Sequence, residues 1–216
     1  MSAESLKITE IFYSLQGETS TVGLPTVFVR LTGCPLRCVY CDTAYAFHGG
    51  ERMTLDAIVA EVKRLSAPWV TVTGGEPLAQ KDCRKLLTRL CDAGFNVSLE
   101  TSGAMDIEGV DDRVAVILDL KTPGSGEVAR NLYDNVRYLK AIDEIKFVIS
   151  DRRDYDWARV KIDEHDLLAK VKNVLFSPVF GALPPRDLAD WLVADRIPVR
   201  MQLQLHKILW NDEPGR

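Results

Sequence analysis

Short apolar segments alternate with helical patterns along almost the whole of this chain. The apolar segments are rich in Val, Ile, Leu and Phe, which is typical of strands buried on both faces of a sheet. Strands that alternate with helices predict parallel βαβ units, in which the helices pack outside the sheet. We expect strands at residues 25–31, 69–73, 96–100, 114–120, 144–150, 173–179 and 198–205.

Helical patterns fill the gaps between these segments. In residues 54–66 apolar side chains recur at helical spacing, and Thr54 is placed to cap the first turn. Residues 81–93 repeat the pattern and place Cys83 and Cys91 on its apolar stripe, where cysteine usually acts as a small buried hydrophobe. Weaker patterns predict helices near 130–141, 154–171 and 186–195.

The chain is too short for these βα units to close into a complete barrel. A complete eight-unit βα barrel usually takes ~250 residues, whereas this chain has 216. We therefore expect an α/β fold of one domain over residues 1–216, built as a shortened, open (partial) βα barrel. Functional side chains in such folds lie at the carboxyl ends of the strands.

The composition argues against several classes of protein. A net charge of −4 without a basic stripe disfavours direct contact with nucleic acid. The first residues lack the pattern of a signal peptide, and no stretch approaches the ~20 apolar residues of a membrane span. We expect a cytoplasmic protein, in which clustered cysteines serve metal binding or catalysis before disulfides.

Three of the five cysteines, Cys34, Cys38 and Cys41, lie within eight positions directly after a predicted strand. A structural zinc site needs four ligands, so a fourth is missing from this loop. Two explanations stay open. Either His48 completes a zinc site, or the three thiolates hold three irons of a 4Fe–4S cluster and leave the fourth iron open to a ligand.

The spacing C-x3-C-x2-C, with Tyr40 before the last cysteine, resembles the cluster loop of radical S-adenosylmethionine (SAM) enzymes. The resemblance implies that SAM chelates the open iron and is cleaved to a 5′-deoxyadenosyl radical. The segment TVTGGEP (71–77) resembles the GGE motif of these enzymes, which binds the SAM amino group. Its glycines allow close approach of the backbone, and Glu76 can accept hydrogen bonds from an ammonium group.

A narrower similarity begins at residues 10–46, which resemble the 7-carboxy-7-deazaguanine synthase family. It implies a carbon–nitrogen lyase of queuosine precursor biosynthesis that converts 6-carboxy-5,6,7,8-tetrahydropterin to 7-carboxy-7-deazaguanine. The radical removes the C6 hydrogen, the six-membered ring contracts, and ammonia is lost. No catalytic side chain is expected, because the cofactor supplies the radical. The similarity continues through residues 99–103, 119–126, 144–150, 177–181 and 202–211.

The resemblance also assigns roles to individual residues. Glu18 can accept from two adjacent N–H groups of a pterin, and Arg30 can bind a carboxylate with two parallel hydrogen bonds. Thr43 is implied as a Mg²⁺ ligand, although its sequence context alone favours a turn or cap beside Asp42. The substrate-binding set is Gln16, Glu18, Arg30, Thr73 and His206. The cofactor-binding set is Tyr40, Gly75, Glu76, Glu100, Ser102, Lys121 and Ser177.

Three further positions carry expectations of their own. Lys146 lies inside an apolar strand, so we expect it to face the barrel mouth or to pair with an acid. His206 is expected at the end of the last strand, with a solvated Lys207 beside it. Whether the tail 211–216 reaches the substrate pocket is left open.

Two other functions remain possible from the sequence. A small radical SAM activase, which makes a glycyl radical on a partner protein, would share the cysteine loop and the GGEP segment, but FYSLQGE and LQLHK argue against it. A non-catalytic zinc or iron–sulfur module would use the cysteines and His48 alone. For the synthase, we expect as partners the pterin, an electron donor such as flavodoxin or ferredoxin, and a second copy in a homodimer.

Overall fold

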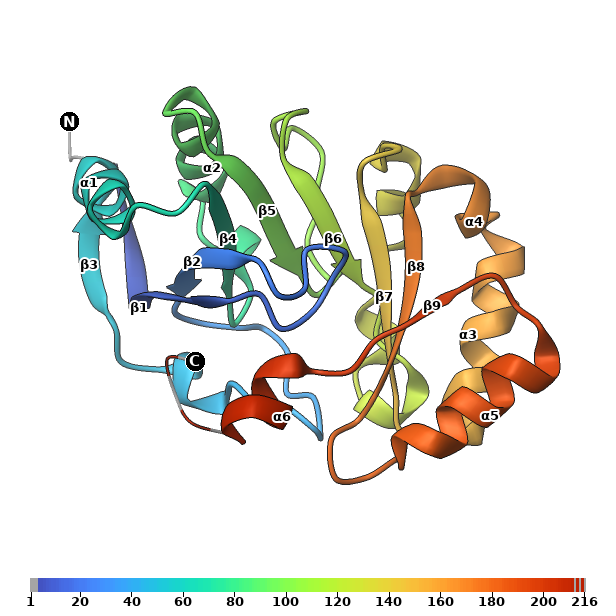
Figure 1. Ribbon diagram of the computed structural model, residues 1–216. Coiled ribbons are helices and arrows are strands. Elements are labelled where there is room, and N and C mark those ends of the chain that lie inside the picture. Colours follow the sequence, from blue (N-terminus) through green and yellow to red (C-terminus); the bar gives the residue numbers. More distant parts are fainter. Residues whose placement is uncertain (1–3, 212, 214, 216) are drawn as a thin grey trace.

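A curved sheet forms the centre of the fold (Figure 1). This computed structural model describes residues 4–211, 213 and 215, and within them nine strands follow the order β3-β1-β2-β4-β5-β6-β7-β8-β9. Neighbouring strands from β2 to β9 are parallel, whereas β1 pairs antiparallel with both β2 and β3. The two outer strands of this order do not pair with each other, so the barrel is partial and open, as predicted.

The strands are β1 (Ser5–Leu15), β2 (Pro25–Leu31), β3 (Glu51–Thr54), β4 (Trp69–Gly74), β5 (Asn96–Thr101), β6 (Ala115–Asp119), β7 (Glu144–Ile149), β8 (Asn173–Pro178) and β9 (Arg200–Met201). The α-helices are α1 (Leu55–Leu65), α2 (Cys83–Asp92), α3 (Arg152–Glu164), α4 (Leu167–Lys170), α5 (Pro185–Asp195) and α6 (Leu205–Trp210). Short 3-10 helices are η1 (Ala44–Phe47), η2 (Pro77–Ala79), η3 (Pro123–Ser125), η4 (Val128–Arg130) and η5 (Tyr133–Tyr138). None of the described helices is long and apolar enough to cross a membrane.

Most predicted strands are confirmed, but the ends of the sheet differ from the prediction. The strand expected at 198–205 is reduced to β9, because the chain leaves the sheet after the backbone N–H of Gln202 bonds to Phe176. His206 therefore lies in α6 and not at a strand end. β1 and β3 were missed. β1 mixes polar and apolar residues and has an irregular register near Ile8, so it lacks a continuous apolar run.

Two predicted helices also differ from the structure. The helix expected at 154–171 begins earlier, at Arg152, and breaks between α3 and α4, where Asp166 adopts a left-handed backbone conformation (φ 50°). The helix expected near 130–141 is replaced by the 3-10 segments η4 and η5. The helices α1, α2 and α5 agree with the prediction.

Strand alternation gives the sheet an apolar outer face and an inner face that carries polar side chains. On β4, Val70 and Val72 belong to the hydrophobic core, whereas Thr71 and Thr73 bond to polar side chains of the interior. β5 repeats this, with Leu99 in the core. The strands are therefore buried on both faces, as expected, and the inner face is mixed, with hydroxyl groups of β4 beside apolar side chains such as Phe28 and Ile117. This alternation delivers polar groups to the inside of the barrel.

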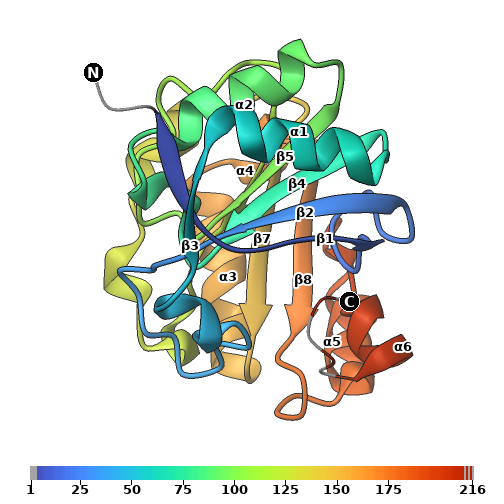
Figure 2. The ribbon, with the colours of Figure 1, turned by 90° about the vertical axis from the view of Figure 1, so that its left-hand side faces the viewer.

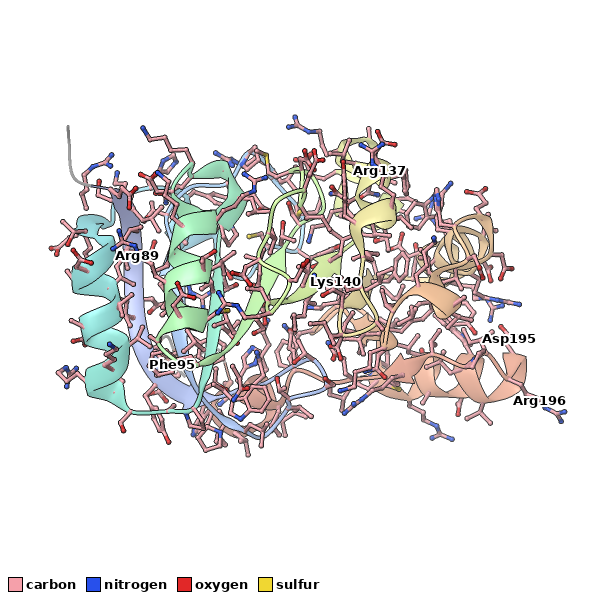
Figure 3. The ribbon with its side chains drawn as sticks, turned by 90° about the horizontal axis from the view of Figure 1, so that it is seen from above. Arg89, Phe95, Arg137, Lys140, Asp195 and Arg196 are labelled. Carbon is pink, nitrogen blue, oxygen red and sulfur yellow. The ribbon has the colours of Figure 1, made fainter. Side chains whose placement is uncertain are left out.

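The helices cover the outside of the sheet. Figure 1 and Figure 2 show α1 and α2 over one part of the sheet and α3, α4 and α5 over the other, with α6 apart from both groups. Arg89 of α2 ion-pairs with Asp56 of α1 (2.7 Å) and with Glu4 (2.8 Å) on the outer surface (Figure 3). The exposed pairs contribute little to stability, so packing of the apolar stripes holds these helices in place.

The start of α1 provides a test of the fold. The side-chain oxygen of Thr54 accepts a hydrogen bond from the backbone N–H of Ala57 (3.2 Å). Thr54→Ala is expected to lower the free energy of unfolding by about 1 kcal/mol, because an N-terminal N–H of α1 loses its partner. Anaerobic urea unfolding measures the change. Thr54→Ser keeps the oxygen and serves as the control; equal destabilisation by both variants would contradict the capping role.

Candidate functional site

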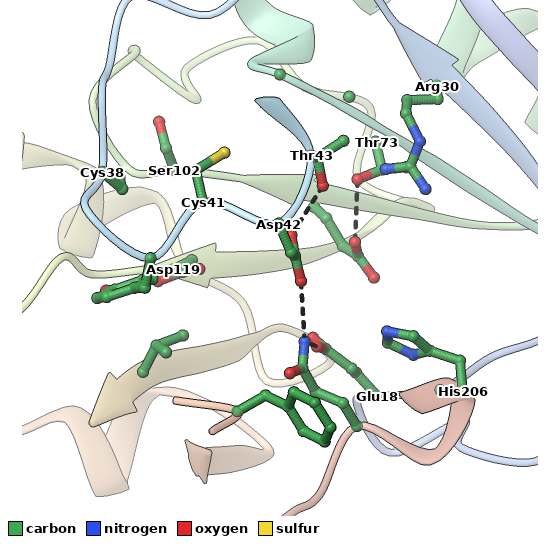
Figure 4. A pocket seen from close by; sticks show the side chains of 18 of the residues that line it. Glu18, Arg30, Cys38, Cys41, Asp42, Thr43, Thr73, Ser102, Asp119 and His206 are labelled. Atoms are coloured by element: carbon green, nitrogen blue, oxygen red, sulfur yellow. Dashed lines mark hydrogen bonds between the residues drawn. The ribbon is translucent and has the colours of Figure 1, made fainter. Parts of the chain in front are cut away.

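One cavity of about 620 Å³ opens at the carboxyl ends of the parallel strands. Side chains from within β2, β4, β5, β6 and β7 line it, together with residues that follow β2, β5, β6 and β8, as a βα barrel predicts. The turn after β1 and the helix α6 complete the wall on the other side. The close-up in Figure 4 shows the cysteine loop facing Glu18 and His206 across this space.

The cysteine loop occupies one side of the cavity. Cys34, Cys38 and Cys41 all line it, and none is in a disulfide. Burial raises the pKa of Cys34, and it raises the pKa of Cys38 to about 11. At neutral pH both thiols therefore keep their protons until a cation displaces them. His48 is exposed and is not among the cavity residues, so the structure does not bring the four predicted zinc ligands together.

The end of β4 packs directly on this loop. A Cβ atom at Gly75 would lie 2.2 Å from the Gly33 carbonyl oxygen and 2.8 Å from the Cys34 Cβ. The backbone N–H of Glu76 also donates to the Gly33 oxygen (2.8 Å). Any side chain at position 75 would push the first cysteine away, so glycine is required there. The two sequence motifs are thus parts of one wall.

Glu76 and Ser177 do not line the cavity. The Glu76 side chain is completely buried, and its carboxylate accepts from the Thr101 hydroxyl (2.9 Å), the Ser102 backbone N–H (2.7 Å) and the Ser102 hydroxyl (2.6 Å). These bonds join the ends of β4 and β5. Ser177 is buried within β8. In the structure Glu76 fixes the wall of the cavity and does not point into it.

Asp119 and Lys121 lie next to the cysteine loop. Lys121 Nζ donates to Asp119 Oδ2 (2.9 Å), and Asp119 Oδ1 is buried without a partner among the residues described. Burial alone would lower the pKa of Lys121, but Asp119 raises it above its ordinary value, so the amine is charged. Three thiols, a lysine ammonium and an unpaired carboxylate oxygen on one wall fit an iron–sulfur cluster with a polar, charged cofactor bound to it.

The opposite side of the cavity holds a buried ion pair between Glu18 and Lys146. The pairing confirms that Lys146 faces the mouth and meets an acid. Burial tends to raise the pKa of Glu18, but the charge of Lys146 lowers it below its ordinary value, so the carboxylate is ionised. Its second oxygen accepts a hydrogen bond from Gln204 Nε2 (2.8 Å).

Glu100 lies deeper in the barrel, beside the two expected substrate residues Gln16 and Thr73. It accepts hydrogen bonds from Thr73 Oγ1 (3.0 Å) and from Gln16 Nε2 (3.3 Å). Burial, and then the negative charge of Glu18, raise the pKa of Glu100. This carboxyl group was predicted as a cofactor contact, yet the structure groups it with the substrate set.

Arg30 lines the cavity but already has a carboxylate partner. Its Nε lies 2.6 Å from Glu10 Oε1, and its guanidinium carbon lies 5.7 Å from the Phe12 ring and 5.9 Å from the Tyr45 ring. The aromatic rings and the acid hold the guanidinium in one orientation. Figure 4 shows Arg30 beside Thr73 in the cavity. Gln16, Glu18, Arg30, Thr73 and His206 all line the same cavity, as do Tyr40, Thr43, Gly75, Glu100, Ser102 and Lys121.

The C-terminal segment completes the wall. Asn211, Glu213 and Gly215 line the cavity, which answers the question left open for the tail, while residues 212, 214 and 216 lie outside the described residues. Lys207 was expected to be solvated, and this was wrong. Its side chain is 8% exposed and ion-pairs with Asp42 (3.0 Å). The prediction failed because it placed this segment in a strand and not in a helix folded over the mouth.

Sequence reasoning missed three acidic or amide groups of the site. Asp42, Asp119 and Gln204 all line the cavity. Asp42 was detectable, because it lies between the last cysteine and Thr43. Gln204 gave no signal, since its role depends on where the chain turns after β9.

Comparison with known proteins defines the class first. The model of the radical SAM superfamily matches residues 28–149, which carry the cysteine loop and the strands β4 to β7, so the chain belongs to that superfamily. Its members use a 4Fe–4S cluster and SAM. The crystal structure of QueE from Escherichia coli shares the fold, with a TM-score of 0.73, 24% identity, and coverage of 94% of this chain and 95% of that one.

Curated relatives then define the particular family. A 7-carboxy-7-deazaguanine synthase of Chlorobaculum tepidum is 48% identical over 99% of this chain and 98% of its own length. A relative of the same name from Koribacter versatilis is 44% identical, covering 96% of this chain and 98% of its own. One from Thermoplasma acidophilum is 40% identical, covering 96% and 99%. The chain belongs to the 7-carboxy-7-deazaguanine synthase family.

The contact between Gly17 and His206 gives a prediction for this site. A Cβ atom at Gly17 would lie 2.1 Å from His206 Nδ1. Gly17→Ala is therefore expected to lower the free energy of unfolding by about 1–3 kcal/mol through overpacking. In a His206→Ala background the same substitution should cost less than half as much, because the clashing ring is gone. Urea unfolding of the four proteins measures this coupling. Equal costs in both backgrounds would show that α6 does not rest on Gly17.

Proposed function

We propose that this chain catalyses the conversion of 6-carboxy-5,6,7,8-tetrahydropterin to 7-carboxy-7-deazaguanine, with loss of ammonia. The observation that carries the proposal is a single cavity with three thiols on one side and a buried, ionised Glu18 on the other. Near full-length similarity to synthases of that name supports the same reaction. Queuosine precursor biosynthesis is the pathway that this product serves.

The cysteine side is proposed to hold the cofactors. Cys34, Cys38 and Cys41 would bind the 4Fe–4S cluster, and Gly75 lets the end of β4 pack directly against the first of these cysteines. When bound, the cluster and SAM supply the 5′-deoxyadenosyl radical that removes the hydrogen at C6 of the pterin. Tyr40, Ser102 and Lys121 are proposed to hold SAM by its polar groups. Glu76 supports this wall from behind.

The side of the cavity that holds Glu18 is proposed to bind the pterin. The ionised Glu18 accepts hydrogen bonds from the amidine edge, and Gln16 and His206 contact the ring system. Lys146 keeps Glu18 charged in a site from which water is largely excluded. Thr43 is proposed to bind a Mg²⁺ ion that also holds the substrate carboxylate; its hydroxyl lines the cavity and donates to Asp42 (2.9 Å). Arg30 adds a fixed positive charge at the rim.

The activase alternative fits the cavity less well. An activase must admit a peptide loop of a partner protein. Here α6 and residues of the C-terminal segment lie in the wall, and polar contacts tie them to both sides of the mouth. A cavity of this size and polarity suits a small molecule beside a cofactor. An electron donor such as flavodoxin or ferredoxin, a homodimer and a cytoplasmic location remain part of the proposal.

Product analysis tests the proposed reaction directly. The chain, reconstituted anaerobically and supplied with dithionite, SAM, Mg²⁺ and the pterin, is expected to yield 5′-deoxyadenosine and 7-carboxy-7-deazaguanine together. Mass spectrometry detects both. Cys38→Ala, which removes one cluster ligand, should yield neither. Deoxyadenosine from the intact chain without the deazaguanine would refute the substrate, and turnover by Cys38→Ala would refute the cluster assignment.

Glu18→Gln tests whether the Glu18 carboxylate binds the pterin. The variant keeps the size of the side chain but replaces an oxygen acceptor with an NH₂ donor, which opposes the donor edge of the pterin. We expect the KM for the pterin to rise about tenfold or more, since a hydrogen bond to a charged group contributes ~1.5–3 kcal/mol. Iron content and SAM affinity should not change. An unchanged KM would show that Glu18 only neutralises Lys146.

A further inference from the structure

The groups around α6 form a chain of polar contacts across the mouth of the cavity. Lys207 Nζ lies 3.0 Å from Asp42 Oδ2, and Gln204 Nε2 donates to the same Asp42 oxygen (3.3 Å) and to Glu18 Oε1 (2.8 Å). Glu18 then pairs with Lys146. Two ion pairs are thus bridged by one amide, and the chain runs from the cysteine loop to β7.

The amide of Gln204 reduces the repulsion between two neighbouring acids. Asp42 and Glu18 carry like charges on opposite sides of the mouth, and each would repel the other in a partly buried site. The amide nitrogen lies between them and gives one N–H to each, while a lysine neutralises each acid from its far side. The two lysines and the amide together offset the repulsion between the two acids.

Lys207 also has consequences for the neighbouring hydroxyl. Thr43 Oγ1 donates its proton to Asp42 Oδ1 (2.9 Å), as Figure 4 shows. With its proton committed to Asp42, the Thr43 oxygen keeps its lone pairs for the cavity, which a metal ligand requires. The Asp42 side chain is 43% exposed and has room to turn outward, whereas the Lys207 side chain is 8% exposed and sits 5.1 Å from the Phe180 ring. The lysine is the fixed member of the pair.

We propose that Lys207 is a positioning residue that holds Asp42 inward, so that Thr43 presents its oxygen to the cation and Gln204 keeps Glu18 aligned. The C-terminal helix thereby sets the geometry of the cysteine loop and of the substrate turn at the same time. This inference rests on the proposed function, because it assigns the cation site of that function to Thr43. The observations behind it are the contacts of Lys207 and Gln204 with Asp42 in the cysteine loop.

The test uses the cluster-loaded protein and compares Lys207→Met with Lys207→Arg. Methionine fills similar space without charge, whereas arginine can keep the ion pair. For Lys207→Met we expect about tenfold more Mg²⁺ at half-maximal turnover, as is usual when an outer partner of a metal ligand is lost. Turnover at saturating Mg²⁺ should fall much less, and Lys207→Arg should keep the wild-type Mg²⁺ requirement.

A second measurement does not depend on turnover. Mn²⁺ is added to the protein with the pterin but without SAM or reductant, and the electron paramagnetic resonance signal of free Mn²⁺ reports the bound fraction. Lys207→Met should bind Mn²⁺ about tenfold more weakly than wild type. Iron content and the cluster absorbance are measured on the same samples and should match wild type.

A double-mutant cycle with Asp42→Asn shows whether Lys207 acts through Asp42. The double variant should lose no more Mn²⁺ affinity than the worse single variant. If Lys207→Met does not fold, Asp42→Asn alone carries the test, because it breaks the same ion pair with an isosteric side chain. Unchanged Mg²⁺ and Mn²⁺ affinity in the variants would overturn the proposal, and so would loss of the cluster. Absence of product from wild-type protein would instead count against the proposed function.

Discussion

The buried carboxylate of Glu76 is the interaction on which the rest of the site depends. It lies beneath the cavity and binds the hydroxyl and backbone groups at the end of β5, while its own backbone N–H bonds to Gly33 at the start of the cysteine loop. A buried acid of this kind is stable only when its lone pairs accept hydrogen bonds, and removal of the carboxylate would leave the buried donors around it unsatisfied. One residue therefore ties β4 to β5 through its side chain and to the start of the cysteine loop through its backbone.

The register of the strands determines which side chains face the cavity. Because side chains alternate along each strand, the residues that pack the helices and the residues that face the cavity are set by the same register. Lys146 reaches the interior in this way and pairs with Glu18 from the turn after β1, while Glu100 reaches it as a carboxyl group whose pKa is raised by burial and by Glu18. The cavity is thus a set of opposed charges that burial strengthens and mutual pairing stabilises.

Sequence patterns predicted the parallel part of this architecture well, for physical reasons. Strands such as β4 and β7 carry apolar runs, and the cysteine spacing is restrictive enough to indicate a cluster. The failures share one cause: they lie where the chain's path depends on tertiary contacts. β1 is held by antiparallel pairing, and residues 202–210 leave the sheet because Gly17 and Asp42 offer better partners than another strand. The burial of Lys207 could not be foreseen without that turn. Glu76 illustrates a different limit, since an acid at a strand end can face a ligand or support the wall behind it.

Closing the open side of the barrel with a six-residue helix has a dynamic consequence. Ile208 and Leu209 are 59% and 50% exposed, and the contacts of α6 with the described residues include the ion pair of Lys207 with Asp42, whereas the sheet is held by a continuous apolar core. Segments with few buried apolar contacts open locally at a much smaller free-energy cost than global unfolding. Local opening of α6 is therefore expected to cost less free energy than disruption of the sheet, and it would release Asp42 of the cysteine loop and Glu18 of the substrate turn together.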